Sequence, residues 1–166
     1  MRKWGYAALG TAVAAAVIGA PVASAAGEAT GAQAGEQAGQ QECRRAFDQA
    51  VWEDMDSYNK RDGARYSAII HRDMVTVGRR GDIHIGHDAN VTPVIEQQFT
   101  LPYEYSMPWT VTHTVVEGCH MGFAILDAHY LVPSRGIDRH YTLSLTLVRE
   151  HGRWQVIKDT VTDVVS

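Results

Sequence analysis

The spacing of hydrophobic residues along the chain changes its period once, a little before Met74. Within residues 42–61, apolar side chains recur every three or four residues, which is typical of a helix with one buried face. Asp62-Gly63 interrupts this pattern, and residues 64–70 then predict a second, shorter helix. From Met74 onward, apolar and polar residues alternate, which is typical of strands with one buried face. The pattern predicts helices first and strands after them.

The later part of the chain contains the predicted strands and one further helix. A helix is expected to start at Asp88, which serves as its cap, and to run toward Phe99, with Pro93 near its first turns. Long antiparallel strands joined by glycine-containing turns, after helices, predict an α+β fold. The strands are expected at residues 74–78, 82–86, 109–117, 121–132, 139–150 and 153–164.

The start of the chain has the pattern of an export signal. Arg2 and Lys3 precede an apolar run over residues 7–22, and Ala23-Ser24-Ala25 supplies the small residues that signal peptidase recognises. Glycine and proline interrupt the run, which argues against a membrane-spanning helix. We therefore expect residues 1–25 to be a signal peptide cleaved near Ala25, and the mature protein to be secreted without a stable membrane anchor.

Composition divides the remainder into a tether and one folded domain. Residues 26–42 contain almost only Ala, Gly, Gln and Glu, so they predict a flexible linker; a helix is the alternative, which four glycines disfavour. Residues 43–166 suffice for a single domain. Without Arg2 and Lys3, thirteen basic residues remain against nineteen acidic ones, a formal net charge of −6. This charge disfavours nucleic acid and anionic membrane surfaces as partners.

Cys43 and Cys119 are the two cysteines of the chain. Export would place them where a disulfide persists, and the bridge would close a long loop, worth on the order of 4 kcal/mol in the chain-entropy model. Two unpaired thiols are the alternative. The wide spacing, without a CxxC pair, disfavours a redox or zinc site.

Three motifs, in this order, resemble the nuclear transport factor 2-like superfamily. "YNKRD" at residues 58–62 is similar to the helix-ending Asn-x-x-Asp of SnoaL-like members. "HRDMVTVGRRGDIHIGHD" at residues 71–88 resembles their strand, hairpin and helix start, and "LVREHGRWQVI" at residues 147–157 resembles their closing hairpin with its Gly-x-Trp. Among subfamilies, the chain is most similar to the SgcJ/EcaC group of small actinobacterial proteins.

The resemblance implies a cone-shaped fold, in which a curved antiparallel or mixed sheet wraps around the long first helix and leaves a central pocket. A small-molecule ligand and a homodimer are therefore expected. In ketosteroid isomerase-like relatives, acid–base residues line this pocket. The position of their base falls here on Gly78, which has no side chain to accept a proton. Their second donor falls near Thr142 or Ser144, neither of them acidic, and a third position falls on Asp54. Isomerase chemistry by that route is therefore disfavoured.

Asp54 and His113 are the candidate catalytic residues. Asp54 interrupts the apolar stripe of the first helix, where burial would raise its pKa and suit it to acid–base work. At the edge of the stripe it would instead be solvated. His113 lies mid-strand among apolar residues, where an imidazole can exchange a proton or be a hydrogen-bonded structural residue. The expected pocket-lining residues are Val51, Tyr58, Met74, Thr76, Trp109 and Tyr130.

The stretch "GRRGDIHIGHD" at residues 78–88 allows three interpretations. Arg80-Gly81-Asp82 is the tripeptide of adhesion ligands, and His84, His87 and Asp88 have side chains that bind metals. A hairpin in which Gly81 supplies the positive φ of a tight turn explains the stretch best. We therefore expect neither an adhesion loop nor a metal site in it.

Asp127 and His129 lie on one face of a later strand, either as a histidine–carboxylate pair or, as we expect, on the solvated outer face. Asp159 lies on the last strand, where the resemblance gives no functional residue. The sequence contains no nucleophile elbow, phosphate loop or dinucleotide fingerprint, so neither a cofactor nor a metal is expected.

Three functions remain open. The first is an exported protein that binds a hydrophobic or polycyclic metabolite. The second is a cyclase- or isomerase-like enzyme, or an SgcJ/EcaC-type oxidoreductase-associated enzyme, that uses Asp54 with His113. The third is a dimeric interaction module without catalysis.

Overall fold

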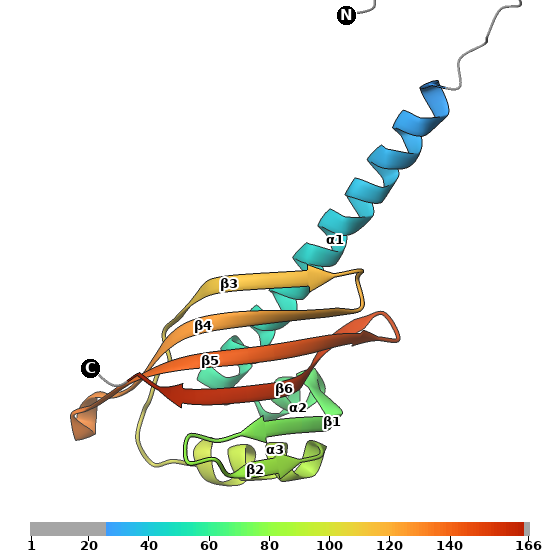
Figure 1. Cartoon of the computed structure of the whole chain (residues 1–166). Coiled ribbons are helices and arrows are strands. Elements are labelled where there is room, and N and C mark those ends of the chain that lie inside the picture. The colour runs from blue at the N-terminus through green and yellow to red at the C-terminus, as the bar shows by residue number, and fades with distance from the viewer. Residues whose placement is uncertain (1–25, 165–166) are drawn as a thin grey trace, which may run out of the picture.

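A six-stranded mixed sheet with helices against one face forms the body of the protein (Figure 1). The computed structural model describes residues 26–164. The helices are α1 (Ala26–Asn59), α2 (Gly63–Ile69), α3 (His87–Pro93), the π-helix η1 (Val94–Gln98) and the 3-10 turn η2 (Pro133–Arg135). The strands are β1 (Ile70–Val77), β2 (Ile83–Ile85), β3 (Trp109–Glu117), β4 (Met121–Val132), β5 (Ile137–Glu150) and β6 (Arg153–Asp163). The predicted α+β class is confirmed.

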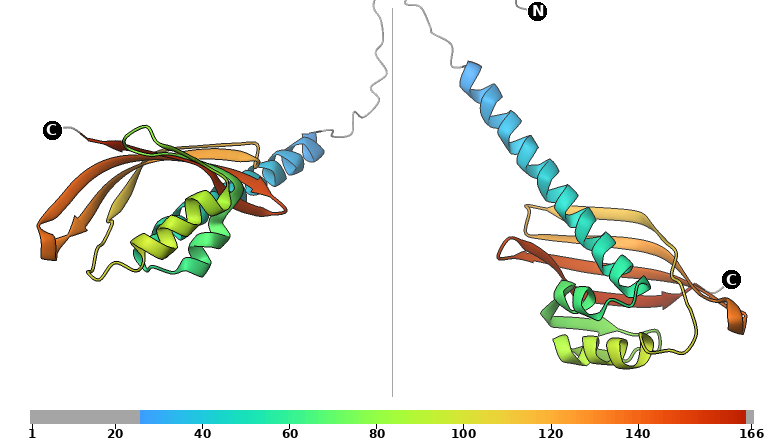
Figure 2. Two further views of the ribbon diagram at one scale, coloured as in Figure 1. Left: turned by 90° about the horizontal axis from the view of Figure 1, so that it is seen from below. Right: turned by 180° about the vertical axis from the view of Figure 1, so that it is seen from behind.

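The strands lie in the order β2-β1-β6-β5-β4-β3, and every neighbouring pair is antiparallel except β1 and β6, which are parallel. The sheet curves, and the helices lie on its concave side (Figure 2). Register shifts interrupt three of the strand pairs. Such β-bulges bend and twist a sheet locally, which helps it to wrap around the helices.

The C-terminal half of α1 packs across the concave face. Phe47, Val51 and Met55 are at most 3% exposed and join the alternating buried residues of β4 and β5 in one core. The Phe47 ring makes an edge contact with Trp154, at 5.3 Å between centroids. A Cβ atom at Gly122 would lie 2.6 Å from the Phe47 ring, so glycine is what allows the helix to approach β4 this closely.

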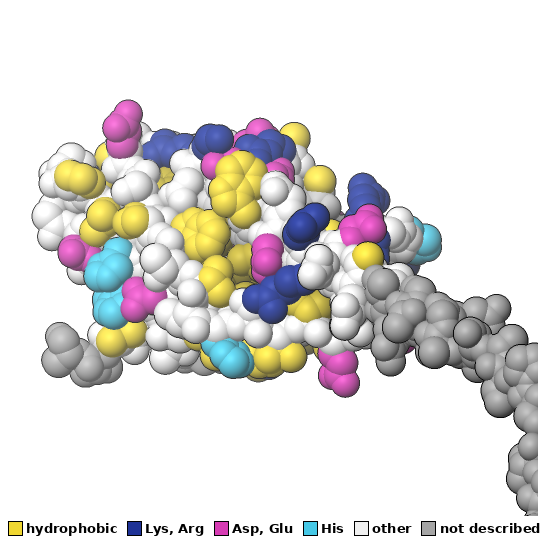
Figure 3. Space-filling view, turned by 90° about the horizontal axis from the view of Figure 1, so that it is seen from above, with side chains coloured by type: hydrophobic (Ala, Val, Ile, Leu, Met, Phe, Trp, Pro, Cys, Tyr) yellow, Lys and Arg dark blue, Asp and Glu magenta, His cyan; other side chains and the backbone are white. Residues whose placement is uncertain are grey.

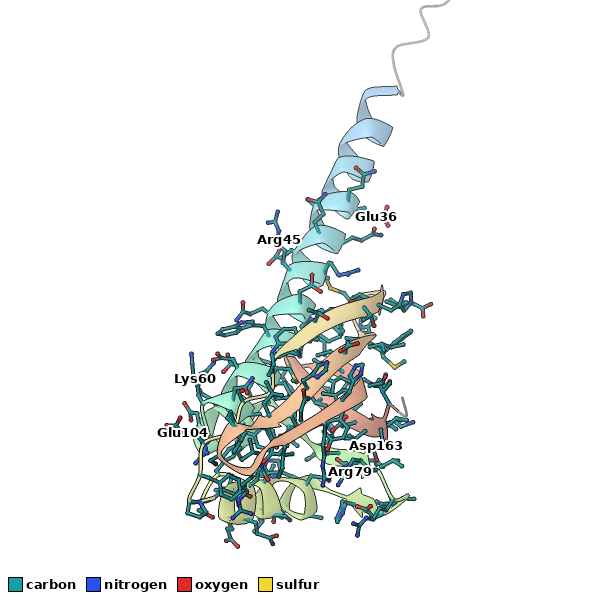
Figure 4. All side chains as sticks on the ribbon, turned by 90° about the vertical axis from the view of Figure 1, so that its left-hand side faces the viewer. Glu36, Arg45, Lys60, Arg79, Glu104 and Asp163 are labelled. Atoms are coloured by element: carbon teal, nitrogen blue, oxygen red, sulfur yellow. A yellow bond between two sulfur atoms is a disulfide. The ribbon has the colours of Figure 1, made fainter. Side chains whose placement is uncertain are left out.

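The prediction of a flexible linker at residues 26–42 is wrong, because α1 begins at Ala26 and includes these residues. Residues 35–42 are exposed, and this part of the helix, which includes Glu36, projects from the body (Figure 4). Ala, Gln and Glu are strong helix formers, and the packed half of α1 removes the cost of nucleation. These two effects outweigh the glycines, each of which costs about 1 kcal/mol in a helix.

Of the two alternatives for Cys43 and Cys119, the structure has the disulfide, with 5.4 Å between the two Cα atoms. It joins α1 to the turn between β3 and β4. The Nη1 of Arg149 lies 3.1 Å from the sulfur of Cys119. The bridge therefore fixes the point at which α1 leaves the sheet.

The stretch at residues 78–88 forms the β1–β2 hairpin. Gly81 has a φ of 82°, and the Gly78 amide donates to the Asp82 carbonyl at 2.8 Å, as a tight turn requires. The ring of His84 lies beside Asp82, whereas His87 contacts Asp88 and Ser67. His84 therefore pairs with Asp82, whereas His87 and Asp88 pair with each other.

Asp88 does not cap the next helix as expected. Gly86 is the N-cap, and no side-chain hydrogen bond completes it, because α3 already begins at His87 and Asp88 lies in its first turn. Pro93 ends α3, and a π-helical turn carries the chain on to Gln98. Proline has no amide hydrogen to donate, so a change of helix type at this residue is expected.

The signal peptide expected at residues 1–25 lies outside the described residues. Within residues 26–164, no helix combines the length and the apolar character needed to cross a membrane.

Candidate functional site

A cavity of about 740 Å³ lies between the helices and the concave face of the sheet. Strands β1, β4, β5 and β6 contribute to its floor, and α1, α2 and α3 form its walls. The hairpin between β1 and β2 borders its open end. The volume falls in the range of about 300–1,000 Å³ that is typical of small-molecule sites.

Four of the six expected lining residues, Tyr58, Met74, Thr76 and Tyr130, contribute to the cavity wall. Two do not. Val51 is 2% exposed and belongs to the core. Trp109 is on the edge strand β3, which packs against the core rather than bordering the cavity.

Asp54 lies on the helical wall of this cavity. It is 8% exposed, although it carries a carboxyl group on the buried face of α1. Loss of hydration, together with the smaller effect of the Asp159 charge, raises its pKa to about 8. At neutral pH, Asp54 is therefore mostly protonated and can donate a hydrogen bond.

Asp159 faces the same cavity from β6. Burial among protein atoms raises its pKa to about 7, against the backbone amide of Thr160, which lowers it. Its Oδ1 has no hydrogen-bond partner in the described protein. The cavity thus contains a second carboxyl group, which carries a proton only part of the time at neutral pH.

The two carboxyl groups give the cavity a proton donor and a proton acceptor at one pH. Because their charges interact, they titrate as a pair rather than as independent groups. Pairs of acids whose surroundings separate their pKa values are a common basis for acid–base catalysis. They also bind a ligand that has both a hydrogen-bond donor and an acceptor.

Tyr58 and Tyr130 line the cavity near the end of α1, and further aromatic rings pack against them. Tyr58 lies 5.6 Å from Tyr105 and 5.7 Å from Phe99, between ring centroids, and Tyr105 lies 5.4 Å from Tyr130. The Tyr130 hydroxyl accepts a hydrogen bond from the side chain of Gln98 at 2.8 Å. This wall presents flat apolar surface, which suits a ligand with rings.

Two phenols remain neutral inside the cavity. Burial raises the pKa of Tyr58 and of Tyr66 well above the usual value. The charges of Asp54 and Asp159 raise the pKa of Tyr66 further. Both hydroxyl groups therefore stay protonated at any physiological pH and can donate to a ligand.

Cationic side chains lie at the open end of the cavity. Arg79, Arg80 and Arg139 all contribute to its lining. The guanidinium of Arg79 lies 3.4 Å from Asp163 and above the ring of Tyr141, so part of its charge is compensated (Figure 4). The open end of the cavity is thus more positive than its interior.

His113 does not reach this cavity, which corrects the expected partnership with Asp54. It lies on the outer face of β3, where it is exposed and its ring contacts Phe123. A bulge at Thr112 causes the difference, because Val111 pairs with Leu126 and His113 already pairs with Ile125. Counting alternate residues from Trp109 therefore predicts the wrong sheet face for the side chains after the bulge.

Asp159 is the site residue that the sequence did not reveal, again because of a bulge. Thr146 pairs with Lys158 but Leu147 pairs with Val156, so β6 has one extra residue at that point. Unbroken alternation from Val156 would turn Lys158 inward and Asp159 outward. Burying the charge of Lys158 would cost much free energy. The sequence therefore indicated that inward and outward residues exchange places near Lys158.

The Asn-x-x-Asp motif has a structural role beside the cavity. Asn59 ends α1, and its side chain donates to the Met107 carbonyl and accepts from the Met107 amide. Asp62 caps α2 by accepting a hydrogen bond from the Arg65 amide at 3.1 Å. The motif therefore fixes both helix ends that border the cavity and takes no part in its chemistry.

No family model and no curated protein sequence matches the chain. Solved structures match it in shape. A ketosteroid isomerase-like protein from Erwinia carotovora atroseptica is 15% identical, with a TM-score of 0.61 over 74% of this chain and 96% of its own. A hexachlorocyclohexane dehydrochlorinase is 12% identical, with a TM-score of 0.63 over 76% of this chain and 88% of its own.

A third match is an NTF2-like protein from Shewanella oneidensis MR-1. It is 12% identical, with a TM-score of 0.59 over 72% of this chain and 98% of its own. At these identities, the similarity concerns the fold. From its element order, its curved sheet and these matches, the chain has the NTF2-like, or cystatin-like, α+β fold.

Proposed function

We propose that this protein is exported and binds a hydrophobic or polycyclic metabolite in the cavity. The observation that carries the proposal is a cavity of about 740 Å³ whose lining includes the rings of Tyr58, Tyr66, Tyr130 and Tyr141. Export rests on the signal-like pattern of residues 1–25. The motifs at residues 58–62, 71–88 and 147–157 support a relationship to the SnoaL-like proteins, and within them to the SgcJ/EcaC group.

The polar groups of the cavity restrict the ligand further. Protonated Asp54 and the phenol of Tyr66 donate hydrogen bonds, so they favour a ligand with carbonyl or hydroxyl oxygens. Arg80 and Arg139, at the open end, favour an anionic substituent that remains near solvent. A planar, oxygenated compound with one acidic group fits these requirements.

We include a homodimer in this proposal. Val115 and Met121 on the outer sheet face are 39% and 51% exposed, and Phe123 lies on the same face beside His113. Contiguous apolar surface of this kind is typical of an interface between protein chains. A dimer formed through it would leave the cavities on the opposite face accessible.

Catalysis is the second candidate function, and the raised pKa values of Asp54 and Asp159 favour it. One carboxyl group would remove a proton from the bound ligand while the other donates one, as in an isomerisation or a cyclisation. In this form of the hypothesis, Asp159 takes the role that His113 cannot fill. The wall at Gly78 still lacks a side chain for the isomerase-like route.

Native mass spectrometry of the protein, purified from its own culture medium, tests the binding proposal. We expect a small molecule bound to the wild-type chain. Thr76→Trp, which fills the cavity from β1, should remove it, whereas Thr112→Trp, on the outer face, should retain it. A chain that never carries a ligand, or that retains it in Thr76→Trp, contradicts the proposal.

Turnover of the identified ligand then separates binding from catalysis. If the protein is an enzyme, Asp54→Asn and Asp159→Asn should abolish conversion while the ligand still binds. The exposed Asp48→Asn on the same helix is the matched control. Conversion that is unchanged in both cavity variants, or no conversion in the wild type, removes the catalytic hypothesis and leaves the binding proposal intact.

A further inference from the structure

Two histidines and a carboxylate lie together on the outer face of the sheet. His129 of β4 lies directly across from His140 of β5, and Asp127 lies on the same face, two residues before His129. The adjacent residues Tyr130 and Arg139 point the other way and line the cavity. In Figure 3, imidazoles (cyan) and carboxylates (magenta) lie side by side at the left-hand end of the molecule. The cluster is therefore separated from the cavity by the thickness of the sheet.

The distances within this cluster are close to those around a shared metal ion. Asp127 Oδ1 lies 2.9 Å from His140 Nε2 and 3.8 Å from His129 Nε2. One potential ligand atom from each residue lies within 4.8 Å of the others. Ligand atoms bound to a tetrahedral Zn²⁺ at about 2.0–2.2 Å are separated from one another by roughly 3.3 Å.

A fourth residue, Asp138, orients one of the imidazoles. Its Oδ1 lies 3.1 Å from His129 Nδ1. A neutral His129 that donates its Nδ1–H to this carboxylate presents the lone pair of Nε2 toward Asp127. Metal-bound histidines usually donate their second ring N–H to such a carboxylate, which fixes the tautomer and makes the ring a better ligand. The contact with Asp138 is thus a second, independent sign of a ligand at Nε2.

The two rings can adjust to an ion between them. They stack with 4.4 Å between centroids and 12° between planes, so their lone pairs now run nearly parallel. The side chains of His129 and His140 are 42% and 35% exposed, and they can tilt toward each other by rotation about their own bonds.

We propose that Asp127, His129 and His140 bind one divalent transition-metal ion, with Asp138 as a positioning residue. Two imidazoles and a carboxylate suit Zn²⁺, Cu²⁺ or Ni²⁺ rather than the oxygen-preferring Mg²⁺ or Ca²⁺. The fourth coordination position faces solvent. The ion links β4 to β5 and competes with protons for the imidazole nitrogens.

Titration of the full, tag-free, chelator-treated chain with ZnCl₂ in a calorimeter tests the site. We expect one ion per chain. His129→Gln, His140→Gln and Asp127→Asn should each lower the affinity by about 100-fold or more, since each removes a ligand atom. Asp138→Asn should lower it by about 10- to 100-fold, and Asp138→Glu should restore it. A purely structural Asp138 would leave the affinity unchanged.

Two other histidines serve as matched controls. Within residues 35–164, His113 is exposed on the same sheet face without a carboxylate partner, and His84 pairs with the carboxylate of Asp82 but with no second imidazole. His113→Gln and His84→Gln should keep the wild-type affinity.

A measurement on the wild-type protein tests the site even if the variants fail to fold. In NMR spectra of the imidazoles, Zn²⁺ should shift the signals of His129 and His140 and leave those of His113 and His84 in place. Absence of saturable Zn²⁺ binding overturns the proposal. So does binding that persists in the three ligand variants, or that shifts the control histidines instead.

Discussion

Asp54 on α1 and Asp159 on β6 contribute carboxyl groups to one cavity from the two layers of the fold, and the charge of Asp159 raises the pKa of Asp54. Burial is the larger cause of the raised pKa in both. Neither carboxylate has a cationic partner among its side-chain hydrogen bonds or ion pairs in residues 35–164. The folded protein is therefore less stable when these two carboxyl groups are charged than when they are protonated.

The stability of the protein should fall as the pH rises from about 4 to about 8. The unfolded chain releases the Asp54 proton near its ordinary pKa of 3.8, whereas the folded protein holds it up to about 8. The stabilising contribution of such a group is therefore fully present below the unfolded-state pKa. It decreases by roughly 1.4 kcal/mol per pH unit as the pH rises, until the pH reaches the folded-state pKa. Asp159 contributes in the same direction up to about pH 7.

Asp54→Asn should flatten this pH dependence, because asparagine is neutral in both states. The variant should unfold at a higher urea concentration than the wild type at pH 8, and at a similar one at pH 4. Asp48→Asn, on the exposed face of the same helix, should behave as the wild type. If the wild-type protein gains stability between pH 5 and 8, the pKa values of Asp54 and Asp159 are not raised and the prediction is wrong.

Gly122→Ala should destabilise the fold by about 1–3 kcal/mol, since a Cβ atom there would lie 2.6 Å from the buried Phe47 ring. Gly39→Ala is the matched control, because it has no atom within 4 Å of a Cβ and lies in the exposed part of α1. It should leave the thermal midpoint unchanged and raise the helical signal in circular dichroism. Equal effects of the two substitutions would contradict the close packing of α1 on β4.

Reduction of the Cys43–Cys119 bridge should lower the free energy of unfolding by about 4 kcal/mol, because the bridge closes a loop with a sequence separation of 76 residues. The double variant Cys43→Ser, Cys119→Ser should show the same loss without a reducing agent. Chemical denaturation in oxidising and reducing buffer measures it. If the wild type is equally stable in both buffers, the bridge does not form in solution.

The sequence predicted the elements of this fold where alternation is unbroken. β3 and β4 have the expected bounds, because each strand has glycine-containing turns beyond it and a clear period of two. The resemblance to NTF2-like proteins supplied the curvature and the cavity, which periodicity alone does not give.

The site was harder to predict, because its geometry depends on bulges. One extra residue in β3 turns His113 outward, and one in β6 turns Asp159 inward. Asp54 was identified because α1 is regular. A charged residue within its apolar stripe must therefore point toward the buried side of the helix. The pairing of His129 with His140 depends on the register between β4 and β5, which the hairpin loop fixes and the sequence pattern does not reveal.

The central claim is that burial in the cavity raises the pKa of two carboxyl groups, those of Asp54 and Asp159. Carbon-13 NMR of the aspartate carboxyl groups, followed from pH 3 to pH 9, measures it most directly. We predict that the signals of Asp54 and Asp159 move in coupled steps near pH 7 to 8, while that of the exposed Asp48 moves near its ordinary value. If Asp54 and Asp159 both titrate near pH 4, the cavity is filled with water at this wall and the claim is wrong.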